Sequence, residues 1–330
     1  MQPSSQSLKK ASNPVEMNFT LNILGTASAL PTVGRYPSAQ VLDVRGRLFL
    51  IDCGEGVQMQ LRKARMSILK IDTIFLSHLH GDHTFGIFGL LSTMSMLGRK
   101  TPLDIYAPEA FGKVLEDFMA SFGEGFKFEP VHHVVKTAGP EPVFSTRTVE
   151  VYAFPLKHRI ETYGYLFRET VPMNNIRKEA IGKYDLTLAE IAALKRGEDV
   201  VRNPGTGAEV TITNAEAAYR PYEPRSFAYC SDTAPFGELA DWVKGVDLLY
   251  HEATFPVEFS KVAGITGHST TEQAAECAKA AGVKKLVIGH YSSRFKDVSF
   301  YLDEVKNIFP DAVLGQDGMS IDVPLVRNGR

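Results

Sequence analysis

The segment Phe75-Leu-Ser-His-Leu-His-Gly-Asp-His-Thr84 holds four metal-ligand side chains within six residues: His78, His80, Asp82 and His83. It continues the apolar run Ile71–Leu76, which is typical of a buried strand. In an extended chain, alternate side chains point to one side, so residues 78, 80 and 82 can face one point while His83 turns toward another. Imidazole and carboxylate are ligands of zinc and similar divalent ions. The segment therefore predicts a metal site at a strand end.

Three further polar residues directly follow apolar, strand-like runs. They are His158 after residues 149–155, Asp232 after residues 227–230, and His290 after residues 286–289. Proteins with alternating strands and helices gather their functional groups in such loops. We therefore expect these three residues to complete a site that one loop cannot close by itself.

Strand and helix patterns alternate in both halves of the chain. Strands are predicted at Asn18–Leu24, Gln40–Val44, Arg47–Asp52, Ile71–Leu76, Leu103–Tyr106, within residues 126–154, and at Phe227–Cys230, Leu248–His251, Lys285–Ile288 and Ser320–Val323. Helices are predicted at Glu55–Ala64, Thr84–Leu97, Glu109–Phe122, Thr271–Ala281 and Asp297–Ile308. The alternation predicts an α/β sandwich in which helices cover sheets.

Residues 169–225 interrupt this alternation. They mix charged residues, Asn, Pro and Gly with two short helical patterns, Asn174–Ile181 and Leu186–Lys195. We interpret them as an insertion that projects from one domain spanning residues 17–330. The polar residues 1–16 have no apolar signal-peptide core, and we expect them to be a disordered leader, with Met17 as a second possible start.

Composition excludes few functions. No apolar run reaches the roughly 20 residues that a membrane helix needs, so no membrane partner is expected. Three scattered cysteines do not form a disulfide framework and fit a cytoplasmic protein. The net charge of −2 does not mark a nucleic-acid-binding protein. A local basic patch or bound metal can still attract one.

Several motifs together resemble the metallo-β-lactamase superfamily and, within it, the ribonuclease Z family of tRNA 3′ endonucleases. Besides the histidine-rich loop, they are Gly25-Thr-Ala-Ser-Ala-Leu-Pro-Thr-Val-Gly-Arg35, Asp52-Cys-Gly-Glu-Gly56, Phe85-Gly-Ile-Phe-Gly-Leu-Leu91, Pro155-Leu-Lys-His158, His251-Glu-Ala-Thr254, Gly267-His-Ser-Thr270 and His290-Tyr-Ser-Ser-Arg294. The resemblance spans about residues 18–325 apart from the insertion. It implies a four-layer αββα sandwich.

The resemblance also implies a ligand set and a reaction. His78, His80 and His158 would hold one ion, Asp82, His83 and His290 another, and Asp232 would bridge the two. Two divalent ions, Zn²⁺ or alternatively Mn²⁺, would supply hydroxide for attack on a phosphodiester. The products would be a tRNA 3′-hydroxyl and a trailer with a 5′-phosphate. Family habit further implies a homodimer.

Two more residues receive catalytic roles from the resemblance. His268 would contact the scissile phosphate and assist the departing 3′ oxygen, and Glu252 would orient it. Asp82 is a candidate for proton transfer as well as metal binding. His132, His133 and His251 are interpreted as structural, because none has the spacing of a ligand motif. The structural alternative for His268 is that it only precedes a helix whose N-terminal cap is Ser269 or Thr270.

The substrate is the open question. The insertion lies where the resembling family carries an arm that binds the tRNA elbow, so we expect Arg177, Lys178, Lys195 and Arg196 to contact phosphates, and Arg35 to contact substrate near the site. Interspersed acidic residues allow a merely solvated surface instead. Two other functions stay open: a hydrolase of small substrates such as cyclic nucleotides, aryl sulfates or lactones, and a nucleic-acid-binding protein without catalysis.

Overall fold

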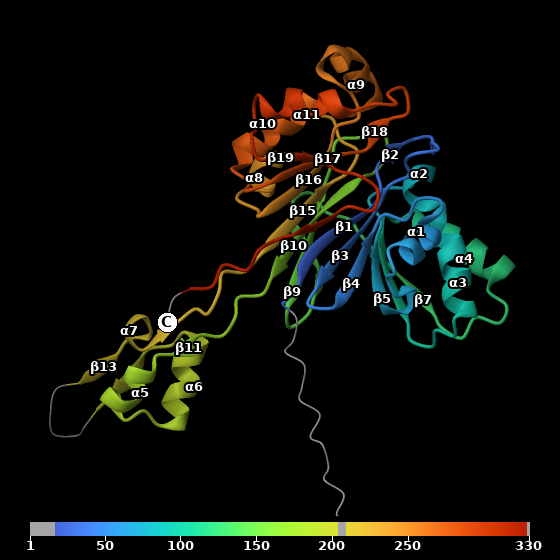
Figure 1. The fold of residues 1–330 in the computed structure, drawn as a ribbon. Helices are drawn as coiled ribbons and strands as arrows, with labels where there is room; N and C mark the ends of the chain where they lie inside the picture. Colours follow the sequence, from blue (N-terminus) through green and yellow to red (C-terminus); the bar gives the residue numbers. More distant parts are fainter. Residues whose placement is uncertain (1–16, 204–208, 329–330) are drawn as a thin grey trace, which may run out of the picture.

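Two seven-stranded sheets pack face to face between two layers of helices in this computed structural model, which describes residues 17–203 and 209–328 (Figure 1). The predicted α/β sandwich is therefore confirmed. The predicted leader at residues 1–16 lies outside the described residues.

Each sheet takes its strands from one continuous part of the chain, residues 19–134 and residues 141–314, apart from the last strand. The first sheet has the order β20 (Ser320–Asp322), β1 (Phe19–Gly25), β3 (Ala39–Val44), β4 (Arg47–Ile51), β5 (Ile71–Phe75), β6 (Leu103–Ala107), β7 (Pro130–Val134). The second has the order β19 (Ala312–Leu314), β17 (Leu286–Gly289), β16 (Leu248–Glu252), β15 (Ser226–Cys230), β10 (Tyr163–Glu169), β9 (Val149–Pro155), β8 (Glu141–Ser145).

Successive side chains of a strand point to opposite faces of its sheet, so each strand packs against two different layers. In β4, Phe49 and Ile51 enter the core between the sheets, whereas Leu48 and Leu50 face the helices α1 (Val57–Lys63), α3 (Gly86–Met96) and α4 (Phe111–Phe122). The outer face of the second sheet is covered by α8 (Leu239–Trp242), α10 (Thr271–Ala281) and α11 (Ser299–Lys306). Strands buried on both faces explain the nearly continuous apolar runs in the sequence.

Two predicted helices have different bounds for local reasons. The helix predicted at Thr84–Leu97 is confirmed as α3, but it begins two residues later, because a separate short helix, α2 (Gly81–Thr84), precedes it and Phe85 lies between the two. The Gly86 N–H donates to the carbonyl of Cys53 at 2.9 Å instead of continuing the helical ladder. Helix α1 begins at Val57 rather than Glu55, because Gly56 has a φ of 84° and cannot belong to a right-handed helix.

Strand direction brings the predicted site residues to one edge. Strands β15, β16 and β17 are parallel to one another. Strand β9 is antiparallel to β10, which is antiparallel to β15, so β9 ends at the same edge as β15. Short elements complete this edge: β2 (Ala27–Ser28), η2 (Val257–Phe259), α9 (Ser260–Thr266) and β18 (Tyr291–Ser292). The short helix η1 (Ile68–Lys70) precedes β5 and lies at the opposite end of that strand.

Residues 170–225, which we call the arm, lie between the neighbouring strands β10 and β15 and project from the sandwich (Figure 1). The arm contains β11 (Asn175–Ile176), α5 (Lys178–Tyr184), α6 (Leu188–Arg196), β12 (Val200–Arg202), β13 (Val210–Ile212), α7 (Asn214–Ala217) and β14 (Ala218–Tyr219). The predicted helix at Asn174–Ile181 starts later, because Asn175 and Ile176 pair with Tyr219 and Ala218 as a strand. Among the described residues, no helix is long and apolar enough to cross a bilayer.

Candidate metal centre

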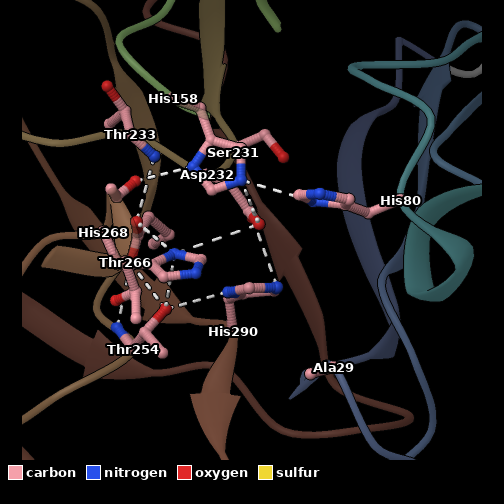
Figure 2. A network of polar contacts seen from close by, with 12 residues as sticks. Ala29, His80, His158, Ser231, Asp232, Thr233, Thr254, Thr266, His268 and His290 are labelled. Carbon is pink, nitrogen blue, oxygen red and sulfur yellow. Dashed lines mark hydrogen bonds and ion pairs between the residues drawn. The ribbon is translucent and has the colours of Figure 1, made fainter. Parts of the chain in front are cut away.

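All seven ligand residues predicted from the sequence meet at the edge where β5, β9, β15 and β17 end. Figure 2 shows His80, His158 and His290 arranged around Asp232. The first cluster consists of His78, His80 and His158. The second cluster consists of Asp82, His83 and His290.

Ring nitrogens of the first cluster converge on one point. Nδ1 of His80 lies 3.0 Å from Nε2 of His78 and 3.3 Å from Nε2 of His158. With Oδ2 of Asp232 these atoms form a group in which all members lie within 4.8 Å of one another. Three imidazole nitrogens and one carboxylate oxygen around one point are a donor set for a tetrahedral divalent ion.

The second cluster converges in the same way. Nε2 of His83 lies 3.2 Å from Nε2 of His290, and Oδ2 of Asp82 lies 3.6 Å and 3.4 Å from these two nitrogens. Two Nε2 atoms this close, beside a carboxylate oxygen, offer two nitrogen ligands and one oxygen ligand to one ion.

Asp232 lies between the two clusters and turns one oxygen to each. Its Oδ2 is 3.5 Å from His78 Nε2, while its Oδ1 is 3.3 Å from His83 Nε2 and 3.2 Å from His290 Nε2. Asp232 is 2% exposed, and within the described residues its Oδ1 has no hydrogen-bond partner. A buried carboxylate oxygen without a hydrogen-bond donor fits a cation bound beside it.

Hydrogen bonds to the outer ring nitrogens select the tautomers. His158 Nδ1 donates to the carbonyl of Gly267 at 2.7 Å, and His290 Nδ1 contacts Oγ1 of Thr254 at 2.9 Å. In both rings the proton is then on Nδ1, so Nε2 points toward the centre with a free lone pair. Such outer partners orient metal-binding histidines in proteins.

Asp52 orients the ring of His83 in the same way, through a buried carboxylate. Its Oδ2 accepts from His83 Nδ1 at 2.7 Å and from the hydroxyl of Tyr229 at 2.7 Å, and both its oxygens accept from Ser77. Asp52 appeared in the sequence only as part of a motif, without a role. Its position directly after β4, at a strand end like the ligands themselves, was the signal that could have identified it.

Three residues near the ligand clusters have a strained backbone conformation. Ala29, Asp52 and His290 are non-glycine residues with φ of 58°, 56° and 63°. The N–H of Ala29 donates to Oδ2 of Asp82 at 2.6 Å, so the strained loop directly orients a carboxylate of the second cluster. Such conformations persist where the surrounding structure holds them, often at functional sites.

Protonation states at the first cluster and at Asp232 suit cation binding. Burial lowers the pKa of His78, His80 and His158, which keeps these imidazoles neutral. Burial alone would raise the pKa of Asp232, but the surrounding imidazoles, led by His290 and His83, outweigh it and keep Asp232 ionised. Neutral imidazole and ionised carboxylate are the forms that bind metal. At His83, in contrast, burial lowers the pKa but the carboxylates of Asp232, Asp82 and Asp52 outweigh it and raise that pKa.

His268 lies beside the clusters and is held by Glu252. Its Nδ1 is 3.0 Å from Glu252 Oε1 and 3.9 Å from Asp232 Oδ2. Burial lowers the pKa of His268, but the carboxylates of Glu252 and Asp232 outweigh it and raise that pKa to about 9. Glu252 is fully buried and also accepts from the backbone N–H of Thr233, Thr254 and Ser269. It therefore positions His268 rather than reaching a substrate.

A cavity of about 530 Å³ opens over both clusters. Its walls include His80, Asp82, His158, Asp232 and His268. Candidate ligands and a candidate proton donor thus face one space.

The predicted structural histidines have partners elsewhere. His133 Nε2 lies 2.8 Å from Oδ1 of Asp104, His132 Nε2 contacts the carbonyl of Ala107, and buried His251 contacts the carbonyl of Glu252. These contacts agree with the structural interpretation.

The predicted substrate residues lie apart from the centre. Arg177, Lys178 and Lys195 line a second cavity, of about 670 Å³, on the arm, whereas Arg196 pairs with Glu198 at 2.8 Å. Arg35 donates to the carbonyl of Phe295 and lies over the ring of Tyr291. It thereby ties its loop to the segment after His290, and its contact with substrate stays a prediction.

Family models match two adjoining parts of the chain. A model described as anti-Pycsar protein Apyc1 matches residues 19–173, and one described as a beta-lactamase superfamily domain matches residues 168–291. The second match, together with the four layers, confirms the metallo-β-lactamase fold that the motifs implied.

Full-length relatives are more specific. The chain is 41% identical over 306 residues to ribonuclease Z of Parabacteroides distasonis. The matched region is 93% of this chain and 99% of that protein. The chain is 42% identical over 308 residues to ribonuclease Z of Cytophaga hutchinsonii, covering 93% and 97%. Among solved structures, human tRNase Z, short form, has a TM-score of 0.67 and 27% identity, covering 92% of this chain and 99% of that chain.

Asp52→Asn tests the support of the second cluster. The amide can donate to His83 Nδ1, which would move the ring proton to Nε2 and remove the inward lone pair. We expect metal affinity to fall about 10- to 100-fold, the range for outer partners of metal ligands. Chelator competition and elemental analysis measure this change.

Asp104→Asn is the matched control, because it removes a carboxylate from a histidine at a half-exposed pair, His133–Asp104. It should leave metal affinity unchanged. Equal affinity in the Asp52 and Asp104 variants would show that Asp52 does not support the centre.

Proposed function

This chain belongs to the ribonuclease Z family, and from that premise we propose that it is a metal-dependent endoribonuclease that removes 3′ trailers from pre-tRNA. The observation that carries the proposal is one cavity bordered by both ligand clusters and by His268. A phosphodiester in that cavity would lie beside cation sites and a proton donor together. Relatives that match 93% of the chain favour RNA over the small substrates left open by the sequence.

We assign one divalent ion to the first cluster and one to the second, with Asp232 between them. Nitrogen and oxygen donors suit Zn²⁺ best, and Mn²⁺ is the alternative. When bound, such ions supply hydroxide at neutral pH and stabilise the charge that develops on phosphate oxygens.

The side chains of this protein have separate tasks. Asp232 and the imidazoles would hold the cations, and Ala29 fixes Asp82 through its N–H. Cleavage of the bond between phosphorus and the 3′ oxygen leaves that oxygen in need of a proton. His268 donates it from Nε2, because Nδ1 is held by Glu252. Asp82 is our second candidate for proton transfer.

We propose that the arm holds the RNA at a distance from the cleavage site. Arg177, Lys178 and Lys195 surround one cavity together with Tyr219, which offers phosphate contacts beside an aromatic ring. Arg196 contributes less, because Glu198 already neutralises it. A homodimer and a cytoplasmic location are proposed from the habits of the family alone.

Incubation of the purified protein with a 3′-extended pre-tRNA and zinc or manganese tests the function. We expect a single cut at the trailer, a 3′-hydroxyl on the tRNA and a 5′-phosphate on the trailer, identified by end mapping. Turnover of bis(p-nitrophenyl) phosphate without any cleavage of pre-tRNA would instead favour a hydrolase of small substrates. Failure on both substrates with metal bound would favour a protein without catalysis.

His268→Ala should slow pre-tRNA cleavage about 10²- to 10⁴-fold, the usual contribution of a general acid or base. Metal content should stay unchanged, because both ligand clusters remain complete. Turnover equal to that of the wild type would remove His268 from the mechanism. Loss of metal would instead make His268 a metal ligand, because its ring nitrogen also lies close to ligand atoms of Asp232 and His290.

Removal of the arm should separate RNA binding from chemistry. Asn175 pairs with Tyr219, so a two-residue Asn-Gly turn can join these two residues in place of residues 176–218, while β10, β15 and the segments that extend from them remain. We expect cleavage of pre-tRNA to fall by about 10²-fold or more, through loss of a second binding point. Turnover of bis(p-nitrophenyl) phosphate should stay within about twofold. Equal losses on both substrates would contradict the proposed role of the arm.

A further inference from the structure

The arm has a small core of its own. Its buried apolar side chains all come from the arm: Ala180, Leu186, Leu194, Val200, Ile212 and Ala217. The direction in which the arm projects therefore depends on the segments that join it to the sandwich. These segments and the groups that hold them, which we call the arm root, have no role in the metal centre.

A buried ion pair closes the arm root. Glu169 is the last residue of β10, where the chain leaves for the arm, and Arg225 is the last residue before it re-enters at β15. Arg225 Nε and Nη2 each donate to one oxygen of Glu169 at 2.9 Å, and the Arg225 N–H donates to Glu169 Oε2 at 3.0 Å. Glu169 is 1% exposed and Arg225 3%. The outgoing and returning segments are thus joined by a two-pronged contact with fixed geometry.

A second arginine ties this pair to the sandwich. Arg45 lies in the turn between β3 and β4, and its Nε donates to Glu169 Oε1 at 2.9 Å. Its Nη2 donates to the hydroxyl of Tyr222 on the returning segment at 2.6 Å, and its guanidinium lies 5.3 Å from the centre of that ring. Arg45 therefore touches the outgoing and the returning segment at once.

The end of the chain braces the returning segment. Glu223 N–H donates to the carbonyl of Val326 at 3.0 Å, and Asn328 N–H donates to the carbonyl of Pro221 at 3.1 Å. Tyr222 pairs with Arg327 between these two bonds. Figure 1 shows the final segment running beside the strands that lead to the arm.

Energetics argue for orientation rather than for stability alone. Two guanidinium groups and one carboxylate leave water to form this contact, and apolar side chains would fill the same space at lower desolvation cost. Charged groups instead fix the relative orientation of the segments that carry them, because hydrogen bonds from several donors to one carboxylate form only over a narrow range of angles. The contacts with Arg225 and Arg45 outweigh burial and lower the pKa of Glu169, so the carboxylate stays ionised.

We propose that Arg45, Glu169, Arg225 and Tyr222 are positioning residues for RNA, which set the angle of the arm to the metal centre. This inference rests on the proposed function, because it concerns a substrate that spans both sites. An RNA held by a correctly aimed arm presents its cleavage site to the cavity at high effective concentration. A small phosphodiester that never reaches the arm gains nothing from the arm root.

Arg45→Gln is the test variant. It removes the contacts to Glu169 and Tyr222 and leaves the buried Glu169–Arg225 pair, so the sandwich stays folded. We expect kcat/KM for pre-tRNA to fall about tenfold or more, mainly through KM. Turnover of bis(p-nitrophenyl) phosphate should change by less than about twofold. Arg45→Lys keeps the charge and should recover part of the loss.

Arg47→Gln is the matched control. Arg47 lies two residues further along the same hairpin, and its guanidinium pairs with Asp72 at 2.9 Å. It should behave as the wild type on both substrates. Equal pre-tRNA kinetics in the Arg45 and Arg47 variants would overturn the proposal, as would an equal loss on both substrates in the Arg45 variant.

A distance measurement tests the arm root without any activity. Spin labels at Leu188→Cys on α6 and Met96→Cys on α3 occupy exposed positions. Cys277 is replaced by serine, while Cys53 and Cys230 are buried. Pulsed dipolar spectroscopy should show a broader or shifted distance distribution with Arg45→Gln than with Arg47→Gln. Unchanged distributions would refute the positioning role. This readout holds even if wild-type protein fails to cleave pre-tRNA, which would refute the proposed function separately.

Discussion

The carboxylate of Asp232 lies between two clusters of imidazole nitrogens, at 3.2 Å to 3.7 Å from four of them. Removing such a group from water is costly unless positive charge compensates it on both sides. The rest of the molecule satisfies this constraint by geometry. Parallel strands end at one edge, so residues more than 200 positions apart in the chain, such as His83 and His290, face the same carboxylate.

Support around the centre is arranged in layers. Asp52, Thr254 and the carbonyl of Gly267 fix the rings of three histidines, and the strained loop at Ala29 fixes Asp82. Glu252 holds His268 in the same manner. The arm root uses the same kind of contact. There the buried carboxylate of Glu169 accepts hydrogen bonds from several donors and sets the angle of the whole arm. In each case a directional polar contact fixes geometry that apolar packing alone would leave loose.

The sequence predicted which side chains gather at the centre, because candidate metal ligands leave a local pattern. Four candidate ligands in one loop, and His158, Asp232 and His290 at later strand ends, needed only the alternation of strands and helices to be brought together. Long-range partners were less accessible. The bond from Gly86 to Cys53 sets the start of a predicted helix, and the strand at Asn175 exists only because Tyr219 returns to it. The contact of Arg45 with Glu169 joins residues 124 positions apart and follows from no local pattern.

Anomalous diffraction from crystals of the wild-type protein grown with zinc tests the central claim most directly. The account predicts two zinc peaks per chain, one among His78, His80 and His158 and one among Asp82, His83 and His290. Each peak should lie within ligand distance, roughly 2.0 to 2.2 Å, of one oxygen of Asp232. A single peak, or zinc bound away from Asp232, would contradict the bridged pair of cations on which the proposed chemistry rests.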